Sequence, residues 1–212
     1  MIEFALLIYQ FIILILAIMI HEISHGTVAY LLGDSTAKDE GRLTFNPIKH
    51  LDLWGSFLLP LTLFFLSAGR FIFGWAKPVP FNPFNLKNPK RDTGLIGLAG
   101  PLSNFLLALV FGVLIRLIVH FQMTALLNLV PFFDLIVLIN LMLGVFNLVP
   151  IPPLDGSKIL FSLLPASAGG IMIFLERYGM FILLAFIFFG FQYLVPLIFW
   201  LHYFIVGTGF LM

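Results

Sequence analysis

The chain has 212 residues, of which 61% are hydrophobic and 10% charged, and its mean hydropathy is +1.10. So few polar side chains cannot cover a water-facing surface, and the composition therefore excludes an ordinary soluble domain and indicates an integral membrane protein. The formal net charge of +1 does not suggest a nucleic-acid partner, and the absence of cysteine excludes disulfides and cysteine-built metal sites. Any bound metal must therefore use histidine, aspartate or glutamate.

Apolar blocks divide the chain into candidate membrane segments of roughly the 20 residues that a helix needs to span a bilayer. They comprise residues 4–32, 51–68, 95–119, 132–149 and 180–212. The first block has no basic region before it and is too long for a signal peptide, so we expect it to be retained as a helix. The last block is long enough for two short helices broken near Gly190 or Pro196, or for one kinked helix.

Polar connections separate these blocks at residues 33–52, 69–92 and 158–178. Gly33 is a natural C-cap for the first helix. The first two connections each contain an extended-looking piece ending in Phe-Asn-Pro, and we expect short β-strands at 41–46 and 76–82. The predicted fold class is an all-α multi-pass membrane protein with about 4–6 membrane segments and short strands in its loops, in a single domain over residues 1–212.

The basic residues distinguish two topologies, because cytoplasmic loops carry an excess of lysine and arginine. If all five blocks cross the membrane, the 11 basic residues divide 4 to 7 between the two faces. If residues 51–68 instead enter and return on one face, 10 of the 11 lie together and only Arg116 lies opposite. We therefore favour the re-entrant topology in a cell membrane, with the N-terminus outside and the active site toward the cytoplasmic side.

The motif HEISH at residues 21–25 carries the clearest chemical signal. His21 and His25 are four residues apart, so both imidazoles lie on one face of a helix, which suits two ligands of one metal ion. Glu22 lies roughly 100° around the helix, where its carboxylate can reach a bound water as general base. Ionisable groups at membrane depth persist mainly where they pair or bind a ligand. The alternative, an interfacial position without function, is disfavoured.

A catalytic zinc usually takes three protein ligands and leaves a position for water, so a third ligand must come from another segment. The block that begins near residue 132 starts on the same face as the first helix, and at about 1.5 Å per residue it reaches the depth of HEISH near residue 154. Asp155 lies there, in NLVPIPPLDG, where prolines interrupt the helix. We predict that His21, His25 and Asp155 bind one zinc ion.

Other ionisable residues are weaker candidates for the metal, namely Asp134, Glu176, His120, His202 and His50. Asp134 lies at the start of its block, at the membrane face opposite to the end where HEISH lies. Glu176 lies in a polar connection. His120 and His202 each stand alone, so interfacial or core placement is favoured for both. For His50, a structural hydrogen bond is favoured over metal ligation.

Two asparagines lie in otherwise apolar segments. Asn104, in GPLSNF, and Asn147 could each join helices through interhelical hydrogen bonds, which is a common use of asparagine in membranes. Asn147 lies eight residues before Asp155, close enough to face the metal. We assign Asn147 to substrate binding or oxyanion stabilisation, with the structural role as the open alternative.

These residues resemble the site-2 protease family of intramembrane zinc metalloproteases. The resemblance rests on HEISH in the first helix, GPLSN in a middle helix and NLVPIPPLDG in a later one, in that order. The pieces GRLTFNP and GWAKPVP resemble the short bacterial and archaeal members that lack a PDZ domain. The family pattern implies His21, His25 and Asp155 as zinc ligands, Glu22 as catalytic base and Asn147 as a substrate-binding or transition-state residue.

The resemblance also implies an activity, the hydrolysis of peptide bonds in or near transmembrane segments, by a zinc-activated water with Glu22 as general base. The expected partners are transmembrane protein or peptide substrates and the lipid bilayer, with no nucleic acid. Because a substrate helix hides its own amides, the two predicted strands could hold it extended by edge pairing. The alternative functions are a membrane metal-binding protein or zinc transporter, and a catalytically silent protein that only binds membrane segments.

Overall fold

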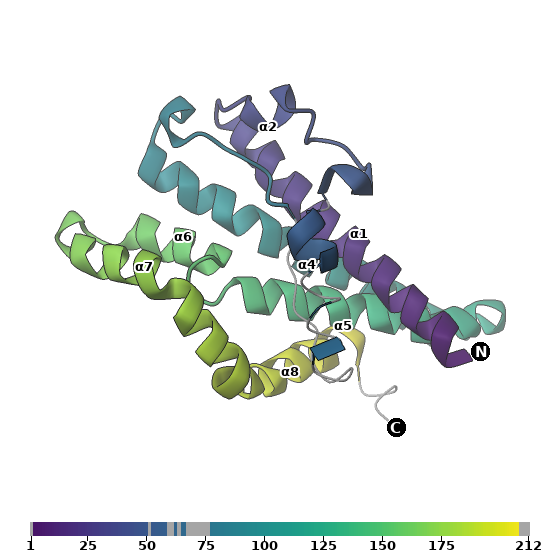
Figure 1. Ribbon diagram of the computed structural model, residues 1–212. Coiled ribbons are helices and arrows are strands. Elements are labelled where there is room, and N and C mark those ends of the chain that lie inside the picture. The colour runs from purple at the N-terminus through teal and green to yellow at the C-terminus, as the bar shows by residue number, and fades with distance from the viewer. Residues whose placement is uncertain (1, 51, 59–61, 63–64, 67–76, 208–212) are drawn as a thin grey trace.

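The computed structural model describes residues 2–50, 52–58, 62, 65–66 and 77–207, and these form a helical bundle (Figure 1). The longer helices are α1 (Ile2–Leu31), α4 (Pro89–His120), α5 (Val130–Asn147), α6 (Asp155–Leu163), α7 (Gly169–Ala185) and α8 (Val195–Val206). Short helical turns connect them: α2 (Thr36–Asp39), η1 (Pro47–His50), η2 (Leu53–Leu58), η3 (Pro83–Asn85), η4 (Thr124–Leu129), η5 (Ala166–Ala168), η6 (Phe186–Gly190) and η7 (Phe191–Tyr193).

Four helical stretches in the described part of the chain are long and apolar enough to cross a membrane. They are Leu6–Leu31, Pro89–His120, Thr124–Asn147 and Ala166–Tyr193. Large apolar side chains are exposed along these helices, which suits a surface that faces lipid and not water. The predicted presence of several membrane-capable helices is therefore confirmed.

Local sequence signals account for the ends of α1 and α4. Gly33 follows α1 with a φ of +112°, a backbone conformation that glycine adopts without strain, as the predicted C-cap requires. At the start of α4, the Asn88 side chain accepts a hydrogen bond from the backbone N–H of Arg91, and Pro89 occupies the first turn.

Helix α4 lies between α1 and α5 and runs antiparallel to α1. Along α1, His21 contacts Asn104 of α4 whereas His25, one turn later, contacts the earlier residue Ile96. Helix α5 runs in the same direction as α1, because Tyr9 bonds to the carbonyl of Phe132 and the later Ala17 packs against Ile139. Thus α1 ends, α4 begins and α5 ends at one end of the bundle (Figure 1).

The C-terminal block forms two helices rather than one. Helix α7 ends at Ala185, irregular turns cover Phe186–Tyr193, and α8 begins at Val195 with Pro196 in its first turn. Of the alternatives left open, two helices broken near Gly190 or Pro196 or one kinked helix, the structure shows two helices with the break around Gly190. Part of the segment 51–68, for which we predict a re-entrant path, lies outside the described residues, and η2 covers Leu53–Leu58.

The predicted strands are not borne out: residues 41–46 and the described part of 76–82, from Lys77 on, form none. Proline lacks an N–H, so Pro78 and Pro80 cannot donate to a strand ladder. Several other backbone groups there bond elsewhere. Two carbonyls, those of Lys77 and Pro78, accept from the Arg42 guanidinium, and the N–H of Lys77 donates to the His50 carbonyl.

Candidate active site

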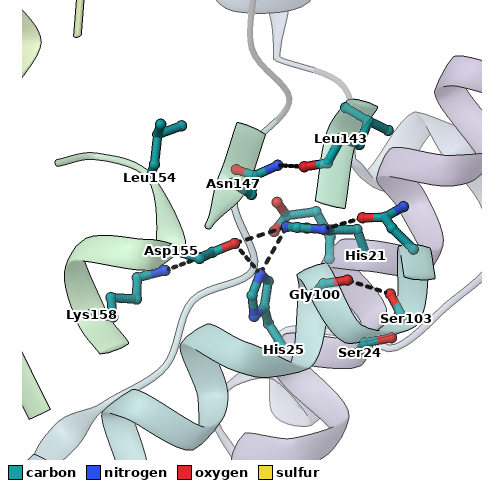
Figure 2. Close-up of polar contacts among 12 residues, drawn as sticks. His21, Ser24, His25, Gly100, Ser103, Leu143, Asn147, Leu154, Asp155 and Lys158 are labelled. Carbon is teal, nitrogen blue, oxygen red and sulfur yellow. Dashed lines mark hydrogen bonds and ion pairs between the residues drawn. The ribbon is translucent and has the colours of Figure 1, made fainter. Parts of the chain in front are cut away.

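His21 and His25 of α1 point toward Asp155, the first residue of α6 (Figure 2). Asp155 Oδ2 lies 3.0 Å from Nε2 of each histidine, and the two Nε2 atoms lie 3.0 Å apart. All three side chains are buried. Residues 134 positions apart in the chain thus meet with three potential ligand atoms at the corners of a triangle.

The opposite nitrogen of each histidine has a hydrogen-bond acceptor. His21 Nδ1 lies 2.6 Å from Oδ1 of the buried Asn104, and His25 Nδ1 lies 2.6 Å from the carbonyl oxygen of Ile96. Because a carbonyl or amide oxygen only accepts, both Nδ1 atoms carry the proton. In the neutral rings both Nε2 atoms then present lone pairs.

Three lone pairs that converge at 3.0 Å repel one another unless a cation lies among them. Four ligands around a tetrahedral zinc, at about 2.0–2.1 Å each, lie roughly 3.3 Å apart, which is close to the observed spacing. Glu22, His21 and His25 also have ligand atoms within 4.8 Å of one another. Nitrogen and carboxylate donors suit zinc, so the residues present fit this ion.

Glycine at position 100 lets α4 approach the two imidazoles. A Cβ atom there would lie 2.4 Å from His25 Nε2 and 2.5 Å from His21 Nε2, closer than any van der Waals contact. Two further glycines of α4, Gly94 and Gly97, give α6 similar access, since their Cβ atoms would overlap Ser162 and Lys158. The small residues of α4 therefore bring α1 and α6 together around the site.

Glu22 is held by the segment 77–82, which we name the strap. The backbone N–H of Val79 donates to Glu22 Oε2 at 2.8 Å. The Val79 side chain also lies against Gly26, one turn after Glu22 in α1, where a Cβ would come within 2.8 Å of Val79 Cγ1. One carboxylate oxygen of Glu22 is thus fixed by the strap.

Two buried charged residues fasten the ends of the strap. Arg42 donates to the carbonyls of Lys77 and Pro78, and Asp34 Oδ2 accepts from the N–H of Asn82 at 2.7 Å. Burial alone would raise the pKa of the Asp34 carboxyl, but hydrogen bonds from Thr36, Asn85 and Asn82 outweigh it and hold that pKa below its ordinary value. Asp34 therefore stays ionised at neutral pH.

Asn147 is not joined to the metal-site residues by any hydrogen bond that the structure records. Its Nδ2 donates to the Leu143 carbonyl of its own helix at 3.0 Å (Figure 2). Asn104, in contrast, links three helices: besides His21 of α1, it bonds through Nδ2 to Asn140 of α5. The interhelical use expected for these asparagines is thus seen for Asn104.

The weaker candidates lie away from the triangle. His202 Nε2 pairs with Asp134 Oδ1 at 2.7 Å, between α8 and α5. His50 bonds through Nε2 to the Thr44 carbonyl, as the favoured structural interpretation predicts. Glu176 is exposed within α7 and not in a connection, and His120 is exposed at the end of α4.

Sequence reasoning missed three groups at the site: the Ile96 carbonyl, the Val79 N–H and Lys158. Backbone groups leave no trace in the residue pattern, so the first two could not have been found. Lys158, which lies 2.8 Å from Asp155 Oδ1, had a signal, because a lysine at i+3 from a helical aspartate lies on the same face.

Known proteins are similar to this chain in sequence. The profile described as peptidase family M50 matches residues 115–190. YwhC of Bacillus subtilis (strain 168) is 41% identical over 181 residues, which cover 83% of this chain and 78% of that protein. Two proteins of Methanocaldococcus jannaschii match over shorter stretches: MJ0392 is 40% identical over 83 residues (39% of this chain, 23% of that protein), and MJ0611 is 44% identical over 70 residues (33% and 34%).

All three relatives bear the name of zinc metalloproteases. No solved structure matches the chain significantly. A relative this similar over most of both chains, together with a zinc-compatible donor set on apolar helices, establishes the relationship. The chain therefore belongs to peptidase family M50, the site-2 protease family, and is a zinc metalloprotease.

Proposed function

We propose that this protein is an intramembrane protease that hydrolyses peptide bonds in or near transmembrane segments of membrane proteins. The observation that carries the proposal is the triangle of His21 Nε2, His25 Nε2 and Asp155 Oδ2, in which both histidines lie on a helix long and apolar enough to cross a membrane. These three residues hold the zinc ion. The whole of residues 1–212 acts as a single protease domain, with the site toward the cytoplasmic side.

The chain's own residues divide the chemistry between them. When bound, zinc polarises the scissile carbonyl and acidifies the attacking water. Glu22, with Oε2 fixed by the Val79 N–H and Oε1 left for the water, accepts the proton of that water. Glu22 then gives the proton to the leaving amine nitrogen, so that a carboxylic acid and an amine are released. Asn147 binds the substrate or stabilises the oxyanion.

A zinc transporter is the alternative that the sequence leaves open. Transport requires successive ligand sets along a path through the membrane. Among the described residues, one group of three or more histidine and carboxylate ligands is found, and the two other buried histidines, His202 and His50, bond instead to Asp134 and to the Thr44 carbonyl. Glu22 would have no part in transport, whereas it has one in hydrolysis.

The substitution Glu22→Gln tests the proposed function. It keeps the shape of the side chain but removes the base, so cleavage of a transmembrane substrate should fall by about 10²–10⁴-fold. Zinc content, measured by atomic absorption on the purified protein, should stay unchanged because Glu22 is not one of the three ligands. Glu176→Gln, at an exposed glutamate of α7, is the matched control and should leave both quantities unaltered. Undiminished proteolysis by Glu22→Gln would refute the assignment.

A further inference from the structure

Asp155 uses its two carboxylate oxygens for different partners. Oδ2 faces the two histidines, whereas Oδ1 lies 2.8 Å from Nζ of Lys158 (Figure 2). The carboxyl group is buried, and Lys158 is only about one-third exposed, so solvent screens this ion pair less than a pair on the surface. A charge-assisted hydrogen bond of this length fixes the orientation of the carboxylate plane.

The surroundings also confine Lys158. Its Cβ packs against the backbone of α4 at Gly97, where an added Cβ would lie only 2.9 Å away. Its Nζ lies 5.9 Å from the centre of the Phe81 ring of the strap. Since α6 positions both residues three apart on one face, the lysine is directed at Asp155 by its own helix, by α4 and by the strap.

This geometry matters because a carboxylate can bind a metal through one oxygen or two. With Oδ1 free, Asp155 could turn and place both oxygens on the ion that the histidines bind. The second oxygen would then take a position that the reaction needs for water and for the substrate carbonyl, since a catalytic site keeps an open position.

We propose that Lys158 is a positioning residue that restricts Asp155 to binding the metal through Oδ2 alone and so keeps the coordination sphere open. This inference rests on the proposed function, because it assumes that Asp155 is a ligand. In this role Lys158 limits how tightly Asp155 binds the metal, whereas an ordinary supporting residue strengthens metal binding. The positive charge of Lys158, so close to the site, disfavours binding of a metal cation. Removing that charge also frees Oδ1 of Asp155 to bind the metal.

The test compares Lys158→Met, Lys158→Arg and the wild-type chain, each purified whole in detergent and loaded with cobalt(II) or zinc. Four-coordinate cobalt absorbs visible light more strongly than cobalt of higher coordination number, so the spectrum reports the coordination geometry directly. Competition with a chromophoric chelator gives the zinc affinity. Cleavage of a transmembrane substrate gives kcat and KM.

For Lys158→Met we expect a weaker cobalt band, a zinc affinity equal to or above that of the wild type, and a kcat reduced by about 10–100-fold with little change in KM. Lys158→Arg keeps a cationic donor and should retain the wild-type band. Lys49→Met removes an exposed lysine of η1 and is the matched control, for which no change is expected.

An unchanged cobalt band in Lys158→Met would overturn the proposal. A zinc affinity lowered more than about tenfold would overturn it too, because Lys158 would then strengthen zinc binding by Asp155. Asp155→Asn separates this failure from a failure of the proposed function. If Asp155→Asn abolishes cobalt binding while Lys158→Met leaves the spectrum unaltered, only the role of Lys158 is wrong. If Asp155→Asn also binds cobalt as the wild type does, the metal site itself is wrong.

Discussion

His21 and His25 present the same nitrogen, Nε2, because each Nδ1 is engaged by an oxygen that can only accept. For His25 that oxygen is the Ile96 carbonyl, which no side-chain substitution removes. For His21 it is Oδ1 of Asn104, which is fully buried and is itself held by Asn140. The tautomer and ring orientation of His21 therefore depend on a side chain outside the metal site.

The substitution Asn104→Ala should lower zinc affinity by about 10–100-fold, because His21 loses the acceptor that fixes its ring. Chelator competition on the purified protein measures this. Asn128→Ala, at an exposed asparagine of η4, is the control and should bind zinc normally. Wild-type affinity in Asn104→Ala would show that helix packing alone orients His21.

At the level of single residues, the sequence predicted the three side chains that converge at the site. His21 and His25 share a helix face by their spacing, and Asp155 followed from the equal depth reached by two helices that start on one face. The position of Asn147 relative to the substrate stays a prediction. Hydrogen-bond partners such as Asn104 depend on how each helix is rotated about its axis, which the residue pattern fixes only loosely.

Among the elements, α4 organises the site because its glycines allow close packing on two sides. Gly100 faces the imidazoles of α1, and Gly94 and Gly97 face α6. Without bulky side chains on this face, the helix backbones approach closely enough for the side chains of His21 and His25 on α1 to meet Asp155 of α6.

Gly100→Ala should therefore disrupt metal binding although it adds a single methyl group to a helix. The new Cβ would overlap both Nε2 atoms, so α4 must move or the histidines must turn away, and zinc affinity should fall at least about tenfold. The control is Gly170→Ala in the first turn of α7, where an added Cβ meets no atom within 4 Å. Normal zinc binding by Gly100→Ala would show that the α1–α4 contact is looser than described.

The loops between α1 and α4 show where element prediction failed. The residues of 41–46 and 76–82 have alternating, extended-looking patterns, but the strap instead bonds to Glu22, Arg42 and Asp34 through its backbone. Side chains that satisfy backbone groups remove the need for a strand ladder. Propensity within a short segment cannot anticipate these distant partners.

For the whole molecule, the antiparallel packing of α1 and α4 bears on topology. The connection between them starts and finishes at one end of the bundle, as the distribution of lysine and arginine predicts for a segment that does not cross. The end of α5 and the start of α7 lie at this end too (Figure 1). Among the described residues, most lysines and arginines lie in this connection or at the start of α4, whereas Arg116 lies near the end of α4.

Single-cysteine labelling tests the orientation, and the absence of native cysteine makes each introduced thiol unique. Cysteines at Arg70 and Lys87 should react with an impermeant maleimide only in inside-out vesicles, because basic loops face the cytoplasm. A cysteine at Gln122, between α4 and η4, should react in intact cells. Labelling of Lys87→Cys from outside would reverse the orientation.

The sequence by itself predicted the membrane class, the approximate helices and the three residues that converge at the candidate metal site. Hydropathy and spacing along one helix are local properties, and Asp155 required only the further comparison of the depths that two helices reach. Only the tertiary structure decided that the loops form a strap and not strands, that Asn104 and Ile96 fix the histidine tautomers, and that Lys158 occupies the second oxygen of Asp155. Each of these depends on the distance and rotation between helices, which arise from packing over the whole bundle.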